Sequence, residues 1–148
     1  MLRRYFAFIA VANLVWETAQ LPLYTIWSEG TVGEIAFAIA HCTAGDILIA
    51  GASLFGALLL VGSGRWPLER YGAVACLAFT GGLSFTIFSE WLNTGIRGNW
   101  AYTEVMPTLP LIGAGVSPFA QWIVIPLAAF WWARRPLGSA KQPKVTDA

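Results

Sequence analysis

Long apolar runs dominate the chain, and four of them are long enough to cross a bilayer as helices. A transmembrane helix needs roughly 20 mainly apolar residues, and the pattern predicts spans at about 5–27, 33–61, 71–93 and 111–133. Short polar segments at 28–32 and 62–70 and a longer one at 94–110 separate these runs. The sequence therefore predicts an all-α, four-helix transmembrane bundle over 1–135, followed by a polar cytoplasmic tail at 136–148.

The composition indicates that lipid is the solvent for most of the chain. Hydrophobic residues make up 57% of the 148 residues and charged residues only 11%, whereas a soluble domain carries about a quarter charged residues. This excludes an ordinary soluble enzyme, and intrinsic disorder would need the opposite bias. The formal net charge of +1 gives no reason to expect a nucleic acid partner. The expected partners are the lipid bilayer and a hydrophobic small molecule.

Lysine and arginine fall almost entirely on one side of the predicted bundle. Short loops rich in these residues stay on the cytoplasmic side of a membrane. If four helices alternate in direction, only Arg97 lies on the far side. The near side holds Arg3, Arg4, Arg65, Arg70, Arg134, Arg135, Lys141 and Lys144. We therefore expect both termini in the cytoplasm and a multi-pass protein of the bacterial cytoplasmic membrane.

The first span has a second interpretation as a cleaved signal peptide. Two arginines precede an apolar run over 5–16, which is the right charge and length. The residue Glu17, however, stands where a cleavage site needs a small residue, and the apolar character resumes beyond Gln20. An uncleaved helix fits this pattern better.

The fourth span has two alternative starting points. It begins either at Leu111 or at Ser117-Pro118, because serine caps helices and proline favours the first helical position. In the second case the segment 113–117 is non-helical backbone, which a bilayer tolerates only where protein or a cavity covers it. The segment 94–116, which carries Trp100 and Tyr102, is then expected to form a cap on the outer side between the third and fourth helices.

Polar side chains inside the spans are the strongest functional signal in the sequence. A charge near the bilayer centre costs at least about 2.5 to 3.5 kcal/mol, so each one is a functional hypothesis. In the first span, Asn13, Glu17, Gln20 and Tyr24 recur at intervals of four, three and four residues and share one helix face. Asp46 lies about 13 residues, or roughly 20 Å, inside the second span, which matches the depth of Glu17. We expect these two acids to meet near the midplane.

These groups predict one polar pocket in the outer half of the bundle. Because no lysine or arginine lies deep in a span, some of the acids must be protonated or bind a cation. The predicted catalytic residues are Glu17, Asp46, His41 and Glu90. The predicted substrate-binding residues are Trp16, Gln20, Tyr24, Asn93, Trp100, Tyr102, Gln121 and Trp122. The alternative, that polar groups only hold helices together by hydrogen bonds, suits the uncharged Asn13, Gln20, Thr86 and Gln121 better than the acids.

The chemistry that suits this pocket is acid–base catalysis on a lipid-soluble isoprenoid or polyene, of the cyclase, hydratase or isomerase type. A buried carboxylic acid can protonate an alkene, and a second carboxylate can take a proton back. Aromatic faces stabilise the resulting carbocation, and the candidates are Trp16, Trp122, Phe37, Phe85 and Phe119. The Trp16-Glu17 pair, with a second intramembrane acid, is similar to integral-membrane terpene cyclases and carotenoid hydratases. This resemblance covers about one helix and assigns no residue role.

Three other functions remain open at this point. Glu17, Asp46, His41 and Glu90 could form a proton or cation pathway, although the inner half offers few polar residues to continue it. The chain could also be a non-catalytic subunit of a larger membrane complex, or form a homo-oligomer. His41, Cys42, Asp46 and Glu90 are metal or haem ligand types without a metal-binding spacing. No metal site is therefore predicted, and the sequence specifies no cofactor.

Overall fold

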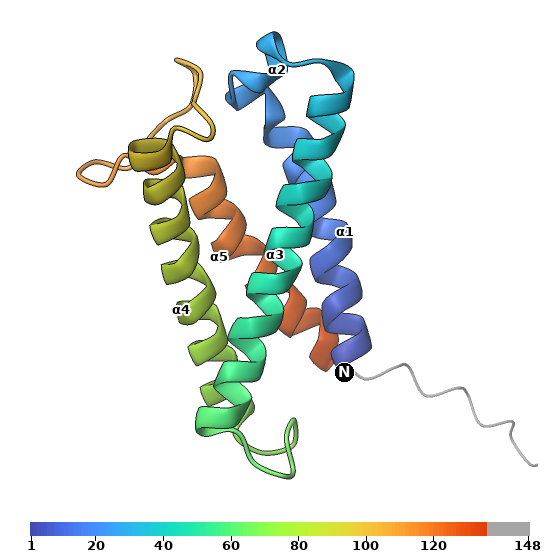
Figure 1. The fold of residues 1–148 in the computed structure, drawn as a ribbon. Coiled ribbons are helices and arrows are strands. Elements are labelled where there is room, and N and C mark those ends of the chain that lie inside the picture. The colour runs from blue at the N-terminus through green and yellow to red at the C-terminus, as the bar shows by residue number, and fades with distance from the viewer. Residues whose placement is uncertain (136–148) are drawn as a thin grey trace, which may run out of the picture.

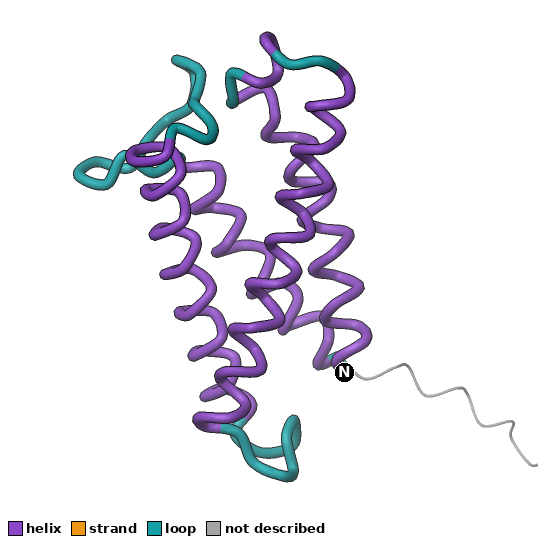
Figure 2. The backbone as a smooth tube through the Cα atoms, viewed as in Figure 1, coloured by secondary structure: helices purple, strands orange, loops and turns teal. Residues whose placement is uncertain are grey.

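Four long helices make up most of the protein. The structure is a computed structural model that describes residues 1–135, and the predicted tail at 136–148 lies outside the described residues. Its elements are α1 (Leu2–Gln20), the 3-10 helix η1 (Leu21–Leu23), α2 (Ile26–Glu29), α3 (Val32–Val61), α4 (Tyr71–Glu90), the π-helix η2 (Trp91–Arg97) and α5 (Val116–Arg134). Helices and loops account for the whole described chain (Figure 2). Four segments are long and apolar enough to span a membrane, which confirms the predicted all-α fold with four potential transmembrane helices.

The four long helices form a ring. Each packs against two neighbours in the order α1, α3, α4, α5 and back to α1. The N-terminus, the loop 62–70 and the end of α5 lie together at one end, which we call the terminal end (Figure 1). Helix α2 and the segment 98–115 lie at the opposite end, which we call the distal end. In this view α3 and α4 are close at the terminal end and diverge toward the distal end.

The terminal half of the bundle is a close-packed apolar core. Alanines on the facing helices allow the backbones to approach closely. Its buried members are Tyr5, Ile9, Ala50, Leu54, Ala57, Val74, Ala78, Ile125, Ala129, Phe130 and Ala133. The hydroxyl of Tyr71 donates a hydrogen bond of 2.6 Å to the carbonyl of Phe130. The Arg4 guanidinium donates to the carbonyl of Trp132 at 2.8 Å and lies over its ring. These contacts join α1, α4 and α5 and close this end.

The first helix ends earlier than the apolar pattern predicts. The predicted span continued to residue 27, but α1 stops at Gln20 and the chain turns through η1 and α2. Proline explains the change, because Pro22 has no backbone N–H to donate to the carbonyl one turn earlier. The next helix starts with a capping box, in which Thr31 and Glu34 each accept a hydrogen bond from the other's backbone amide.

The fourth long helix starts close to the later of the two predicted positions, although a different residue caps it. Helix α5 begins at Val116, and its N-cap is Gly115 instead of Ser117. The prediction of a start at Leu111 is wrong because Leu111 and Gly113 have φ values of 76° and 67°, which no α-helix accommodates. The Ser117 hydroxyl is engaged elsewhere, since it donates to the Gln20 side chain.

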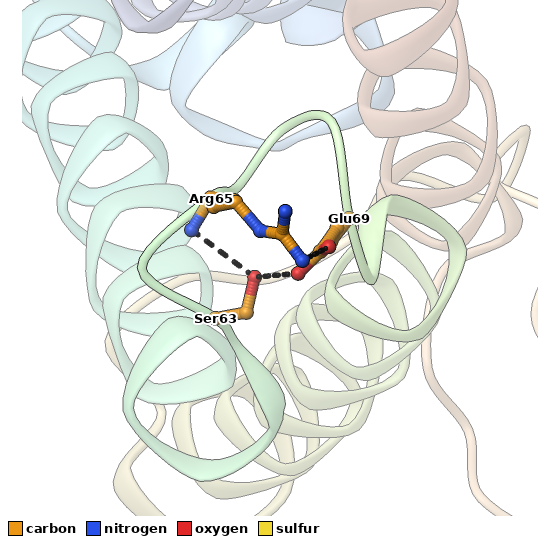
Figure 3. Close-up of polar contacts among 3 residues, drawn as sticks. All are labelled: Ser63, Arg65 and Glu69. Atoms are coloured by element: carbon orange, nitrogen blue, oxygen red, sulfur yellow. Dashed lines mark hydrogen bonds and ion pairs between the residues drawn. The ribbon is translucent and has the colours of Figure 1, made fainter.

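A compact polar turn joins α3 to α4 at the terminal end (Figure 3). The Ser63 hydroxyl accepts a hydrogen bond of 3.2 Å from the Arg65 backbone amide and donates one of 3.2 Å to the Glu69 carboxylate. The Arg65 side chain forms an ion pair with the same carboxylate. The pair is solvent-exposed, so it orders the turn and contributes little to stability.

Candidate functional site: a polar cavity between the helices

A cavity of about 960 Å³ lies in the distal half of the bundle, between α1, α3, α4, η2 and α5. Its volume is at the upper end of the range typical of small-molecule sites. The cavity wall includes ten of the predicted site residues, which are Glu17, Gln20, Tyr24, His41, Asp46, Glu90, Asn93, Trp100, Gln121 and Trp122. The residues that we grouped from their positions in the predicted helices therefore surround one cavity.

The side-chain amide of Gln121 is the centre of the polar network. Its Nε2 lies 2.8 Å from Asn13 Oδ1, 2.8 Å from Glu17 Oε1 and 2.9 Å from Asp46 Oδ2. These oxygens come from α1 and α3, and all the residues concerned are buried. Glu17 and Asp46 are also within hydrogen-bonding reach of each other. The predicted meeting of the two acids therefore occurs, with Gln121 between them.

A second chain of hydrogen bonds fixes the Glu17 side of this network. Gln20 Nε2 donates to Glu17 Oε1 at 2.9 Å, and Gln20 Oε1 accepts from the Ser117 hydroxyl at 2.7 Å. The Trp16 indole donates to the same Ser117 hydroxyl at 3.2 Å. Gln20 and Gln121 thus act as interhelical hydrogen bonders and also line the cavity. Trp16 contacts this network only through Ser117 and is not part of the cavity wall.

Trp122 forms the floor of the cavity. Its indole Nε1 donates to Asp46 Oδ1 at 3.1 Å, and its ring is buried. A Cβ atom added at Gly82 on α4 would lie 2.3 Å from Cζ3 of Trp122. The ring therefore reaches from α5 to both α3 and α4, and the close approach requires glycine at this position. The apolar core begins directly below this floor.

The cavity opens sideways between α3 and α4. Three of its lining side chains, Phe37, Leu48 and Phe85, are 68%, 72% and 51% exposed, so they mark an opening. His41 is also at this opening, exposed and stacked on Phe37 with ring centroids 5.4 Å apart. It therefore lies at the rim instead of beside the acids.

The third acid, Glu90, is held by the segment that follows η2. The Tyr102 hydroxyl donates to Glu90 Oε2 and accepts a hydrogen bond of 2.9 Å from the Gly115 amide. Tyr102 also packs edge-on against Tyr24 at 5.4 Å, and the Thr25 amide donates to the Ala101 carbonyl at 3.0 Å. Tyr102 therefore contacts Glu90 without lining the cavity itself, and it ties the segment 98–115 to α4 and to the chain after α1.

Burial changes the acidity of the two tyrosines outside the spans. Burial raises the pKa of Tyr102 well above its usual range, and the hydrogen bond to Glu90 and its negative charge raise it further. Burial also raises the pKa of Tyr24, with an additional contribution from the charge of Glu90. Both phenols therefore stay neutral at physiological pH and can donate hydrogen bonds.

Sequence reasoning missed several polar residues of the cavity wall. Arg97 and Asn99 line it, although the sequence placed Arg97 in an outer loop. The π-helix η2 continues α4 to Arg97 and brings that residue to the cavity. Thr86 also lines the cavity, but its hydroxyl makes no interhelical hydrogen bond. Its interpretation as an interhelical hydrogen bonder is therefore wrong.

Within residues 1–135, no three His, Cys, Asp or Glu side chains come close enough together to hold a metal ion. Comparison of the chain with protein-family models, with curated proteins and with solved structures finds no match. The functional argument therefore comes from the geometry of the cavity.

Proposed function

We propose that this protein is an integral membrane enzyme that uses Glu17 and Asp46 for acid–base chemistry on a lipid-soluble isoprenoid or polyene. The observation that carries the proposal is that two carboxyl groups from different helices meet in a cavity with a lateral apolar opening. Glu90, His41 and the aromatic side chains of the wall complete the proposed site. The reaction class is that of an isomerase, cyclase or hydratase.

The closeness of the two acids supports a proton held between them. Glu17 Oε1 and Asp46 Oδ2 both lie within 2.9 Å of the Gln121 amide nitrogen, and both residues are buried. Two adjacent buried carboxylates repel each other, and a proton carried by Glu17 or Asp46 removes that repulsion.

The hydrogen bonds that the carboxyl oxygens of Glu17 and Asp46 accept suggest which acid faces the substrate. Both oxygens of Asp46 accept hydrogen bonds, from Gln121 and Trp122. The amides of Gln20 and Gln121 both donate to Oε1 of Glu17, which leaves Oε2 without an amide donor. We assign Glu17 as the proton donor to the substrate and Asp46 as the carboxylate that holds and returns the proton.

The reaction needs no additional reactant in its simplest form. The acid transfers its proton to one carbon of a double bond, whose π electrons form the new C–H bond and leave the adjacent carbon cationic. The Asp46 carboxylate then removes a proton from a neighbouring carbon, and the electrons of that C–H bond form a new double bond. The proton passes from Asp46 back to Glu17, which restores both groups. The Trp122 ring lies beside the acids, where its face can stabilise the cation by up to about 2 kcal/mol. Capture of the cation by another double bond gives a ring, and capture by water gives an alcohol.

The cavity suits a substrate that arrives from the bilayer. Phe37, Leu48 and Phe85 provide apolar side chains at the opening, while Glu17, Asp46 and Gln121 are buried inside. We propose that the terminal end faces the cytoplasm of a bacterium and that the segment 98–115 covers the outer side of the cavity.

The packing below the cavity favours an enzyme over a proton or cation pathway. A pathway needs polar groups or water along its whole length. Below Trp122 the described parts of the helices pack against one another through buried apolar side chains such as Leu54, Val74 and Ala129. The polar network of the distal half therefore stops at the floor of the cavity.

The proposal is tested by expressing the protein in cells that make linear polyenes and analysing their lipid extracts by mass spectrometry. We expect a product with the wild type that is absent with Glu17→Gln and with Asp46→Asn. Glu29→Gln, which changes an exposed acid on α2, is the matched control and should leave the product unchanged. An unchanged product with either cavity variant, at equal protein levels, would contradict the proposal.

A further inference from the structure

Arginines outnumber acids at the terminal end of the bundle (Figure 1). The charged side chains of the described residues at this end are Arg3, Arg4, Arg65, Arg70, Arg134, Arg135 and Glu69. The glutamate is already paired with Arg65, in the only ion pair found within residues 1–135. The other arginines therefore have no carboxylate partner in the described part of the chain, and this end carries a surplus of positive charge.

Two of these arginines, Arg4 and Arg135, are held next to each other at the ends of α1 and α5. The Arg4 guanidinium donates to the carbonyl of Arg135 and lies 4.7 Å from the centre of the Trp132 ring. The Arg135 guanidinium lies 3.5 Å from the centre of the Trp131 ring. Stacking on an aromatic face positions a guanidinium and leaves N–H donors at its edge for an anion.

Each of the two arginines stands at the end of a stripe of apolar side chains on its own helix. The exposed members of the stripes are Val124, Leu127 and Trp131 on α5, and Val11 and Val15 on α1. Counted back from Arg135 or forward from Arg4, they recur at intervals of three, four or seven residues, which places each set on one helix face. Trp132 contacts both Arg4 and Phe8 across the seam between α1 and α5. The two stripes therefore border the same seam.

The length of these stripes matches one leaflet of a bilayer. Val15 follows Arg4 by 11 residues, and Arg135 follows Val124 by 11 residues, which is roughly 16 Å along a helix. The hydrocarbon core of a bilayer is about 30 Å thick, so that of one leaflet is about 15 Å. An acyl chain therefore covers each stripe when the head group of its lipid lies at the arginines.

We propose that Arg4 and Arg135 bind the phosphate group of an anionic phospholipid, whose acyl chains lie on the apolar stripes of α1 and α5. The paired N–H donors of a guanidinium match the oxygens of a phosphate. A zwitterionic lipid carries an ammonium group beside its phosphate, and the surplus of positive charge at this end repels that group. A soluble phosphate would leave both stripes uncovered. This inference does not depend on the proposed function.

The test is native mass spectrometry of the purified full-length protein released from detergent micelles. The probes are phosphatidylglycerol and phosphatidylcholine with the same acyl chains, offered in equal amounts. Because the two lipids differ in head-group charge, the ratio of their bound fractions measures what the arginines contribute. We expect the wild type to favour phosphatidylglycerol by roughly 5- to 25-fold, since one arginine near a membrane surface strengthens the binding of an anionic lipid about 5-fold.

The variants separate this site from the general charge of the terminal end. Arg135→Gln should lower the preference about 5-fold, whereas Arg135→Lys keeps the charge and should keep most of the preference. The double variant Arg4→Gln, Arg135→Gln should bring the ratio close to one. Arg65→Gln is the matched control, because it removes a charge from the same end but Arg65 is paired with Glu69, and it should leave the ratio unchanged.

Three results would overturn the lipid site. The first is a wild-type ratio of one, and the second is a preference that survives in the double variant. The third is an equal loss in Arg65→Gln and Arg135→Gln, which would show attraction by net charge alone. Dimers that bind neither lipid would also contradict the proposal, because a second copy of the chain would then cover this surface. All of these outcomes leave the acid–base proposal standing.

Discussion

Glu17 on α1 and Asp46 on α3 accept hydrogen bonds from one nitrogen, Nε2 of Gln121 on α5, at 2.8 and 2.9 Å. One amide therefore holds two acids from different helices in contact. The same arrangement stabilises the bundle and positions the proposed catalytic groups. The variants below separate these two roles.

Replacement of the central amide should destabilise the protein. Gln121→Leu removes the donor from three buried oxygens, so we expect the free energy of unfolding to fall by about 2 to 4 kcal/mol. Thermal unfolding in detergent measures the change. The control is Thr80→Val, whose exposed hydroxyl bonds only to its own helix, with an expected effect below about 0.5 kcal/mol. If Gln121→Leu were as stable as this control, the hydrogen-bond network around Gln121 would not contribute to the stability of the bundle.

Adjacent glycines on α4 should respond in opposite ways. Gly82→Ala places a methyl group against the Trp122 ring and should cost about 1 to 3 kcal/mol by overpacking. Gly81→Ala meets only Ser53 at 3.9 Å and should be neutral or stabilising, because alanine favours helix over glycine. Tryptophan fluorescence and thermal unfolding report both effects. Trp122→Phe should recover part of the loss at Gly82, and equal effects of the two alanines would contradict the assigned contact.

The phenol of Tyr102 should make stability depend on pH in the alkaline range. An unfolded tyrosine loses its proton near pH 10, whereas the folded protein keeps the Tyr102 phenol neutral above that pH. The contribution of this phenol is therefore complete below about pH 10 and is lost as the pH rises further.

We expect the thermal midpoint of Tyr102→Phe to lie below that of the wild type at about pH 8, because the hydrogen bonds to Glu90 and Gly115 are gone. The difference should narrow at about pH 11. A difference that is constant or larger at the higher pH would contradict the raised pKa of Tyr102.

The orientation of the bundle can be tested with single cysteines. In a background with Cys42 and Cys76 replaced, Leu68→Cys lies in the exposed loop 62–70 of the terminal end, and Val105→Cys in the exposed segment of the distal end. A membrane-impermeant maleimide added to intact cells should label Val105→Cys and spare Leu68→Cys, because arginine-rich loops stay in the cytoplasm. Labelling of Leu68→Cys alone would mean that the orientation is inverted.

Much of the fold could be predicted from the sequence because a bilayer restricts the length and the composition of the helices that cross it. Length and hydropathy identified four spans, and the spacing of Glu17 and Asp46 from the helix starts placed them at one depth. The end of α1 and the start of α5 were less certain, since they depend on backbone conformations at Pro22 and Gly113 that apolar character does not encode.

The cavity was only partly predictable for a different reason. Helical spacing says which residues share a face, but the rotation of each helix against its neighbours is set by tertiary packing. His41 therefore lies at the rim, and Trp16 lies outside the cavity wall. The contact of Trp122 with Gly82 and the unsatisfied hydroxyl of Thr86 depend on atomic positions that no sequence pattern specifies.

The protonation state of the Glu17 and Asp46 pair is the most direct test of the account. Infrared spectroscopy of the purified protein in detergent detects the carbonyl stretch of a protonated carboxylic acid separately from that of a carboxylate. We predict that the wild type shows this band at neutral pH, that Glu29→Gln keeps it, and that the double variant Glu17→Gln, Asp46→Asn loses it. A wild-type spectrum without the band, or a double variant that retains it in full, would contradict a proton shared between these two acids.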